Sequence, residues 1–127
     1  MKKFLSLILA VLMLTLVFTA CGKTDDAKYI EKKGELVVGM TLFAPMNYYD
    51  DDNNLVGFET EFANAIGEEL GLKVKFQEID WAAKETELAS KAIDCIWNGM
   101  TITPEREENM QISIPYMENK QAVVVAD

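Results

Sequence analysis

The hydrophobic and polar positions along the chain predict short strands that alternate with helices from residue 34 onwards. Residues 35–40 form a short, valine-rich apolar run, which is typical of a buried strand. Residues 58–70 place an apolar side chain at about every third or fourth position, which indicates one buried helix face, and Gly71 is a typical helix end. Apolar and polar side chains alternate over residues 72–76, which predicts a second strand.

The second half of the chain continues this alternation. The pattern predicts a helix over residues 81–91, and short apolar runs predict strands over residues 93–97 and 121–126. Thr103 followed by Pro104 is typical of a helix start, with Thr at the N-cap and Pro in the first turn. The order of strands and helices favours an α/β fold with a mostly parallel sheet flanked by helices.

Two irregular segments separate the first strand from the first helix. Pro45 predicts a loop over residues 43–46, because proline disfavours a helical conformation in the residue before it. The run of Asp and Asn at residues 50–54 predicts a turn. Its adjacent acids raise the question of calcium, but the Gly and the distal Glu of an EF-hand loop are missing, so we interpret the segment as a solvated turn.

The N-terminal residues have the pattern of an export signal. Two lysines follow Met1, and residues 4–17 form an uncharged run of about 14 residues, shorter than the roughly 20 residues of a membrane-spanning helix. Residues 18–22 resemble the lipobox of bacterial lipoproteins, with Phe18 where Leu is usual and Cys21 as the lipidated residue. An ordinary signal with a chance cysteine is the alternative interpretation.

This pattern divides the chain into three parts. We expect residues 1–20 to be a lipoprotein signal peptide, residues 21–33 a polar tether, and residues 34–127 one folded lobe. Lipid on Cys21 would anchor the protein to the cell membrane, at the cell surface or in the periplasm, without a spanning segment.

Composition narrows the possible functions. The chain has no histidine, two cysteines and a formal net charge of −9. Removal of the predicted signal peptide takes away two lysines and no acid, which leaves 10 basic against 21 acidic side chains. We therefore expect no nucleic-acid partner, because such partners require clustered Lys and Arg. Cys95 is interpreted as a buried thiol, and we predict no disulfide, metal site, cofactor or catalytic residue.

Candidate ligand contacts gather beyond the predicted strands, where parallel sheets bind ligands at their carboxyl ends. Two segments occupy this position, residues 41–46 and residues 98–106. In the second segment, Gly99 allows close approach of a ligand, Thr101 adds a hydroxyl, and Arg106 adds a planar fork for a carboxylate near a helix start. The alternative is that Arg106 is a solvated helix residue paired with a nearby Glu.

Three aromatic residues lie near these segments. Phe43 follows the first predicted strand, Trp81 begins the second predicted helix, and Trp97 lies in the third predicted strand. Each is suited either to line a ligand cavity or to pack in the core. For Phe43, spacing alone favours core packing.

The sequence resembles a known family in four stretches. These are ELVVG at residues 35–39, LVGFE at 55–59, IDCIWNGMTITPER at 93–106 and SIPY at 113–116. Together they resemble the extracellular solute-binding proteins of family 3, the receptors of polar amino-acid ABC transporters. The resemblance covers residues 34–127 and implies a type 2 periplasmic-binding-protein lobe, an amino-acid ligand, a membrane permease partner and a monomeric protein.

The resemblance also implies roles for individual residues. Arg106 would bind the α-carboxylate of the ligand, with help from the backbone N–H and hydroxyl of Thr101. Gly99 would offer its carbonyl to the α-ammonium group, and Asn98 would contribute a polar side chain.

The resemblance also implies roles for two aromatic residues. Phe43 would stack on the ligand, and Trp81 would line its side-chain region.

The sequence departs from the family pattern in two ways. Met40 stands where the family often has an acid, which weakens the case for a cationic ligand. Family members have two lobes, so the chain is expected to lack the second lobe and to bind with about millimolar affinity or weaker on its own. The alternatives are a dehydratase-like enzyme of the same fold, a sensor lobe and a non-functional gene fragment.

Overall fold

The computed structural model describes residues 25–118, 120 and 122–125. The predicted signal peptide and Cys21 lie outside these residues. The chain divides into two units, residues 1–32 and residues 33–127. Within the predicted tether, the structure forms helix α2 (Asp26–Lys33), which the sequence pattern did not predict. Among the described helices, none has the length and apolar character needed to cross a bilayer.

A parallel three-stranded sheet organises the larger unit, as predicted. Strand β1 (Glu35–Met40) lies at the centre, between β4 (Lys73–Glu78) and β5 (Cys95–Ile96). The predicted strand at 93–97 is therefore shorter than expected. Just before β5, the Asp94 carboxylate accepts the Val37 N–H at 2.7 Å in place of a backbone carbonyl, while the Asp94 N–H still donates to the Val37 carbonyl at 2.8 Å.

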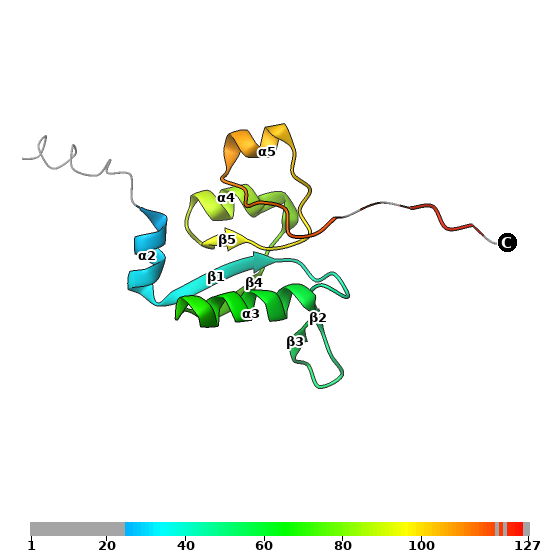
Figure 1. The fold of residues 1–127 in the computed structure, drawn as a ribbon, viewed down its shortest axis with the longest axis horizontal. Coiled ribbons are helices and arrows are strands. Elements are labelled where there is room, and N and C mark those ends of the chain that lie inside the picture. Colours follow the sequence, from blue (N-terminus) through cyan, green and yellow to red (C-terminus); the bar gives the residue numbers. More distant parts are fainter. Residues whose placement is uncertain (1–24, 119, 121, 126–127) are drawn as a thin grey trace, which may run out of the picture. The chain divides into compact units, whose positions relative to one another are not determined.

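Helices cover this sheet and complete the core. Helix α3 (Phe58–Leu70) has the predicted bounds and contacts β4, and α4 (Lys84–Ala89) contacts β5 (Figure 1). Gly71 ends α3 in the left-handed conformation at φ 68°, which glycine adopts without strain. Apolar side chains bury one face of the sheet, with Val37, Ile79 and Ile93 at the centre of the cluster.

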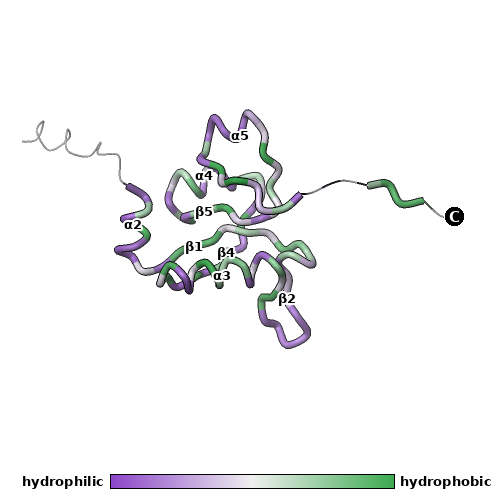
Figure 2. The backbone as a smooth tube through the Cα atoms, in the orientation of Figure 1, coloured by the Kyte–Doolittle hydropathy of each residue, from purple (hydrophilic) through white to green (hydrophobic). Residues whose placement is uncertain are grey.

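The predicted turn at residues 50–54 joins two strands that the sequence pattern did not reveal. Strands β2 (Tyr48–Tyr49) and β3 (Leu55–Val56) pair antiparallel on either side of it. The Asp50 carboxylate accepts backbone N–H groups of Asp52 and Asn54 at 3.0 and 2.8 Å, which closes the turn. Hydrophilic residues colour this turn in Figure 2, whereas hydrophobic residues follow β1.

The predicted second helix is divided. A 3₁₀ turn, η1 (Trp81–Ala83), precedes α4, and the Asp80 carboxylate caps it by accepting the Ala82 N–H at 2.9 Å. Helix α5 (Pro104–Asn109) begins as predicted, with Thr103 at its N-cap.

The predicted final strand is wrong for the residues that the structure describes. Residues 122–125 form no strand, and Val123, Val124 and Val125 are 90%, 94% and 77% exposed. An apolar, β-branched run favours strand conformation, but a strand requires a neighbour that accepts and donates its backbone hydrogen bonds. None of the described strands pairs with this run.

Candidate functional site

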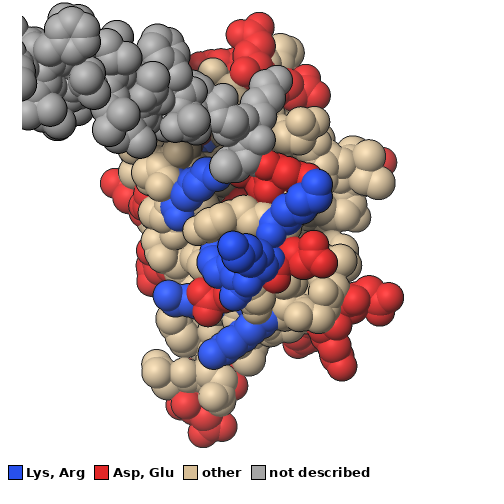
Figure 3. Space-filling model, turned by 90° about the vertical axis from the view of Figure 1, so that its left-hand side faces the viewer, with Lys and Arg blue, Asp and Glu red and all other residues tan. Residues whose placement is uncertain are grey.

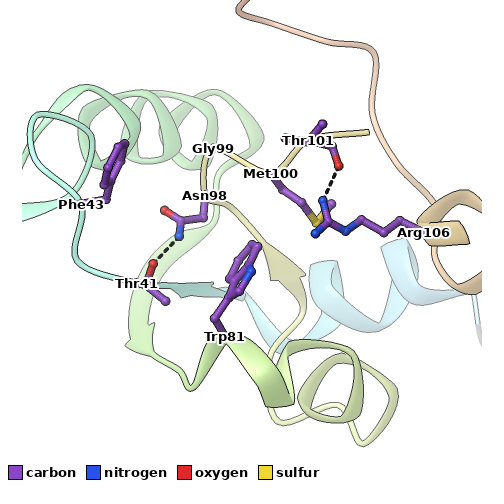
Figure 4. A pocket seen from close by; sticks show the side chains of 8 residues that line it. All are labelled: Thr41, Phe43, Trp81, Asn98, Gly99, Met100, Thr101 and Arg106. Atoms are coloured by element: carbon purple, nitrogen blue, oxygen red, sulfur yellow. Dashed lines mark hydrogen bonds between the residues drawn. The ribbon is translucent and has the colours of Figure 1, made fainter. Parts of the chain in front are cut away.

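The carboxyl ends of all three parallel strands meet at one cavity of about 330 Å³. Each strand contributes through the segment that follows it: Thr41 and Phe43 after β1, Trp81 after β4, and residues 98–101 after β5. Arg106 reaches the same cavity from α5 (Figure 4). The cavity thus contains all six residues that the sequence analysis singled out for ligand binding: Phe43, Trp81, Asn98, Gly99, Thr101 and Arg106.

Arg106 is positioned by the start of α5. The Thr103 hydroxyl accepts the Arg106 backbone N–H at 3.4 Å, and Pro104 fixes the first turn. The guanidinium Nη1 then donates to the backbone carbonyl of Thr101 at 2.5 Å. No carboxylate in the described part of the chain forms an ion pair with Arg106, so the alternative in which a nearby Glu neutralises it is wrong for these residues. Its remaining N–H groups are available to a ligand.

Gly99 lines the cavity without a packing reason to be glycine. A Cβ atom at this position would have nothing within 4 Å. The φ angle of Gly99 is also outside the left-handed region, so its backbone imposes no need for glycine. Neither close packing nor a left-handed backbone therefore accounts for glycine at this position.

The structure separates the three ambiguous aromatic residues: Phe43 and Trp81 line the cavity, whereas Trp97 does not. Phe43 is 60% exposed and lines the cavity, so the core interpretation is wrong for it. Trp97 lies outside the cavity and packs edge-on against Phe62 at 5.3 Å between ring centroids, next to Tyr116. Trp81 lines the cavity, and the Lys84 ammonium lies 5.0 Å from the centre of its ring.

Two lining residues, Thr41 and Met100, were absent from the predicted set. Both lie in the segments that the carboxyl-end rule identified. Thr41 could have been found as the first residue beyond β1. Arg106 carries the only charge among the residues that line the cavity.

Surface charges, the Cys95 thiol and metal-ligating side chains indicate no further chemistry in the described residues. On the face shown in Figure 3, Lys and Arg side chains lie among Asp and Glu side chains. Burial, followed by the charge of Asp94, raises the pKa of the Cys95 thiol to about 11, so it stays protonated and unreactive near neutral pH. The described residues contain no group of three or more side chains placed to hold a metal ion.

A parallel α/β lobe with its cavity at the carboxyl ends of the strands defines the class of the protein. Solved structures that share this fold include type 2 periplasmic amino-acid-binding proteins. Residues 36–127 match the model of the bacterial extracellular solute-binding proteins, family 3, and the chain belongs to that family.

Individual relatives agree with this assignment. The arginine-binding extracellular protein ArtP of Bacillus subtilis is 34% identical over 125 residues, which are 98% of this chain and 48% of ArtP. An ABC uptake transporter substrate-binding protein from Streptococcus pneumoniae with bound histidine has a TM-score of 0.71 and 35% identity, over 76% of this chain and 39% of that protein. The chain therefore spans about half the length of ArtP and 39% of the length of the Streptococcus pneumoniae protein.

Two further solved structures bear on function. A point mutant of domain 1 from TmArgBP, in its arginine-bound form, has a TM-score of 0.67 and 36% identity, over 71% of this chain and 70% of that domain. An ancestral cyclohexadienyl dehydratase has a TM-score of 0.65 and 34% identity, over 70% of this chain and 37% of the enzyme. The fold therefore occurs in binding proteins and in an enzyme.

Proposed function

We propose that the chain forms the ligand-binding lobe of an amino-acid ABC transporter receptor, and that its cavity holds a polar amino acid by the α-carboxylate and α-ammonium groups. The observation that carries this proposal is the guanidinium of Arg106 at the cavity, which forms no ion pair with a carboxylate among the described residues. An arginine fork matches a carboxylate through two parallel hydrogen bonds, and an α-carboxylate is common to all amino acids. Thr101 lies beside this fork and offers its own N–H and hydroxyl.

The remaining lining residues fit the rest of an amino acid. The Gly99 carbonyl accepts from the α-ammonium group, and Asn98 adds polar contacts next to it. Phe43 and Trp81 supply apolar surface to the aliphatic or aromatic part of the ligand side chain. The proposal also includes export of the protein and its attachment to the membrane by lipid on Cys21. From there it would deliver its ligand to a membrane permease.

A dehydratase function is the second candidate, because a structural neighbour is such an enzyme. The residues that line the cavity include no carboxylate and no histidine that could transfer a proton. Binding without chemistry therefore fits the described site better.

Titration with matched ligand pairs tests the proposal. L-Arginine is paired with agmatine and L-histidine with histamine, because each amine lacks only the α-carboxylate of its amino acid. The chain has two tryptophans, so the indole N–H signal of Trp81 reports the cavity while that of Trp97 serves as a control in the core. We expect at least one L-amino acid to shift the Trp81 signal with about millimolar affinity, near 4 kcal/mol, and its amine to have no effect.

The arginine-bound domain 1 of TmArgBP supports the use of one lobe for this measurement. Equal binding of an amino acid and its amine would contradict the carboxylate role. A panel of the twenty L-amino acids that leaves the Trp81 signal unchanged at tens of millimolar would contradict amino-acid binding by this chain.

A further inference from the structure

A hydrogen-bonded network of polar side chains extends from helix α3 to the cavity. It begins at Glu59, which is 1% exposed in the first turn of α3. One carboxylate oxygen accepts the Tyr116 hydroxyl at 2.5 Å, and the other accepts Asn47 Nδ2 at 2.9 Å. Both oxygens of Glu59 are therefore occupied as acceptors.

Glu59 determines which way the Asn47 amide faces. A carboxylate accepts hydrogen bonds and cannot donate them, so the NH₂ end of Asn47 must point towards it. The carbonyl end then accepts the Thr60 hydroxyl at 2.9 Å. Asn47 and Thr60 are 1% and 3% exposed, so water does not offer an alternative arrangement.

Asn47 in turn orients Asn98 at the cavity. The Asn47 NH₂ group has a second N–H, which points to Asn98 Oδ1 at 3.4 Å. Since only the oxygen of the Asn98 amide can accept it, the NH₂ end of Asn98 faces Thr41, and Nδ2 donates to Thr41 Oγ1 at 2.5 Å (Figure 4).

Thr41 is the last residue of this hydrogen-bonded network. Its oxygen accepts from Asn98, so its own hydroxyl hydrogen must point elsewhere. Among the described residues, no acceptor takes that hydrogen, and Thr41 lines the cavity. We propose that Thr41 is a ligand-recognition residue that donates to an acceptor in the ligand side chain, and that Glu59 and Asn47 are positioning residues that fix this polarity. This inference rests on the proposed function and adds a preference for ligand side chains that carry a carbonyl or carboxylate oxygen.

L-Glutamine and L-norleucine provide a suitable pair of probes, because they share the α-amino-acid group and a similar length, while only glutamine has a side-chain acceptor. We expect the complete chain to bind glutamine more tightly. Thr41→Val should lower the ratio of glutamine to norleucine affinity about two- to tenfold, the range of one net hydrogen bond. Thr41→Ser keeps the hydroxyl and should retain the preference.

The positioning role needs a separate readout. Glu59→Gln offers either an acceptor or a donor to Asn47, so the polarity is no longer fixed, and we expect part of the glutamine preference to be lost. Adding Glu59→Gln to Thr41→Val should cause no further loss of preference. Tyr116→Phe removes a donor to Glu59 without reversing Asn47, so it should lower stability and keep the preference.

The outcomes distinguish this inference from the proposed function. Equal loss of both probes in Thr41→Val, or no loss of either, would overturn the role of Thr41 while amino-acid binding stands. Additive loss of preference in the double variant would overturn the positioning role of Glu59. Failure of the unaltered chain to bind either probe would contradict the proposed function and this inference together.

Discussion

The two sides of the cavity are held in different ways. Asn98 and Thr41 are bonded to each other and connected through Asn47 to buried groups beneath them. Arg106 lies on a helix without buried residues, and its side chain bonds to one backbone carbonyl. The first side is fixed by hydrogen bonds within the chain, whereas the second keeps guanidinium N–H groups that the proposed function assigns to a ligand. The comparison predicts that changes at Arg106 affect binding, and changes beneath Asn98 affect stability.

The largest expected effect is on binding through Arg106. Arg106→Ala removes the two proposed charge-assisted hydrogen bonds to the carboxylate, each about 1.5–3 kcal/mol. Because these make up most of the roughly 4 kcal/mol expected for binding, binding of an L-amino acid should become undetectable. Arg106→Lys keeps the charge without the fork and should give an intermediate loss. Urea unfolding should show little change in stability for either variant. Unchanged affinity in Arg106→Ala would refute the carboxylate role.

Asn47→Leu tests the other side. The substitution leaves a Glu59 oxygen and the Thr60 hydroxyl buried without their partner, so we expect a loss of about 3 kcal/mol in the free energy of unfolding. Asn64→Leu makes the same chemical change at an exposed position of α3 and should alter stability by less than about 0.5 kcal/mol. Chemical denaturation measures both. Similar small effects would show that the network contributes little.

The pKa of the Cys95 thiol tests whether strand β5, which precedes Asn98, is shielded from water. Its pKa is raised to about 11 from an ordinary value of 9.0, so above pH 9 the unfolded chain loses the thiol proton while the folded chain keeps it. This contribution to stability is complete below pH 9 and is lost as the pH rises to 11, by about 3 kcal/mol. Cys95→Ala should lack this part of the pH dependence in urea unfolding. Identical pH profiles would indicate that water reaches the thiol.

The smallest expected effects distinguish two glycines. A Cβ atom on Gly39 would lie 2.5 Å from Ile93 Cδ1, so Gly39→Ala should cost about 1–2 kcal/mol of stability through overpacking. Gly99→Ala meets no atom and should leave stability unchanged, but its methyl group occupies the cavity and should weaken amino-acid binding. Thermal unfolding and ligand titration of both variants separate packing from ligand space. Normal binding by Gly99→Ala would argue against a ligand close to this backbone.

Several local patterns predicted their elements correctly, although the apolar run at residues 121–126 did not do so in its described part, residues 122–125. The helical spacing of residues 58–70, the valine run of β1 and the Thr103 N-cap all appear as predicted. Strands β2 and β3 contain two residues each, which is too short for alternation to be visible. Helix α2 buries no residue, so no apolar face revealed it.

The candidate site followed partly from local rules and partly from resemblance. The carboxyl-end rule located the segments around the cavity, and side-chain chemistry selected Gly99, Thr101 and Arg106 within them. The family resemblance then added Asn98 and implied a role for each residue. The buried network could not be predicted, because Asn47 and Asn98 are 51 residues apart and meet only in the folded chain. Their hydrogen bonds depend on tertiary geometry that no spacing in the sequence reveals.

The most direct test of carboxylate binding observes Arg106 itself. It is the chain's one arginine, so its guanidinium Nε–H gives a single assignable NMR signal. Titration with an L-amino acid that shifts the Trp81 indole should shift this signal with the same affinity, and the corresponding amine should leave it in place. An Arg106 signal that remains unchanged while Trp81 responds would contradict the account, because the amino acid would then occupy the cavity without its carboxylate on Arg106.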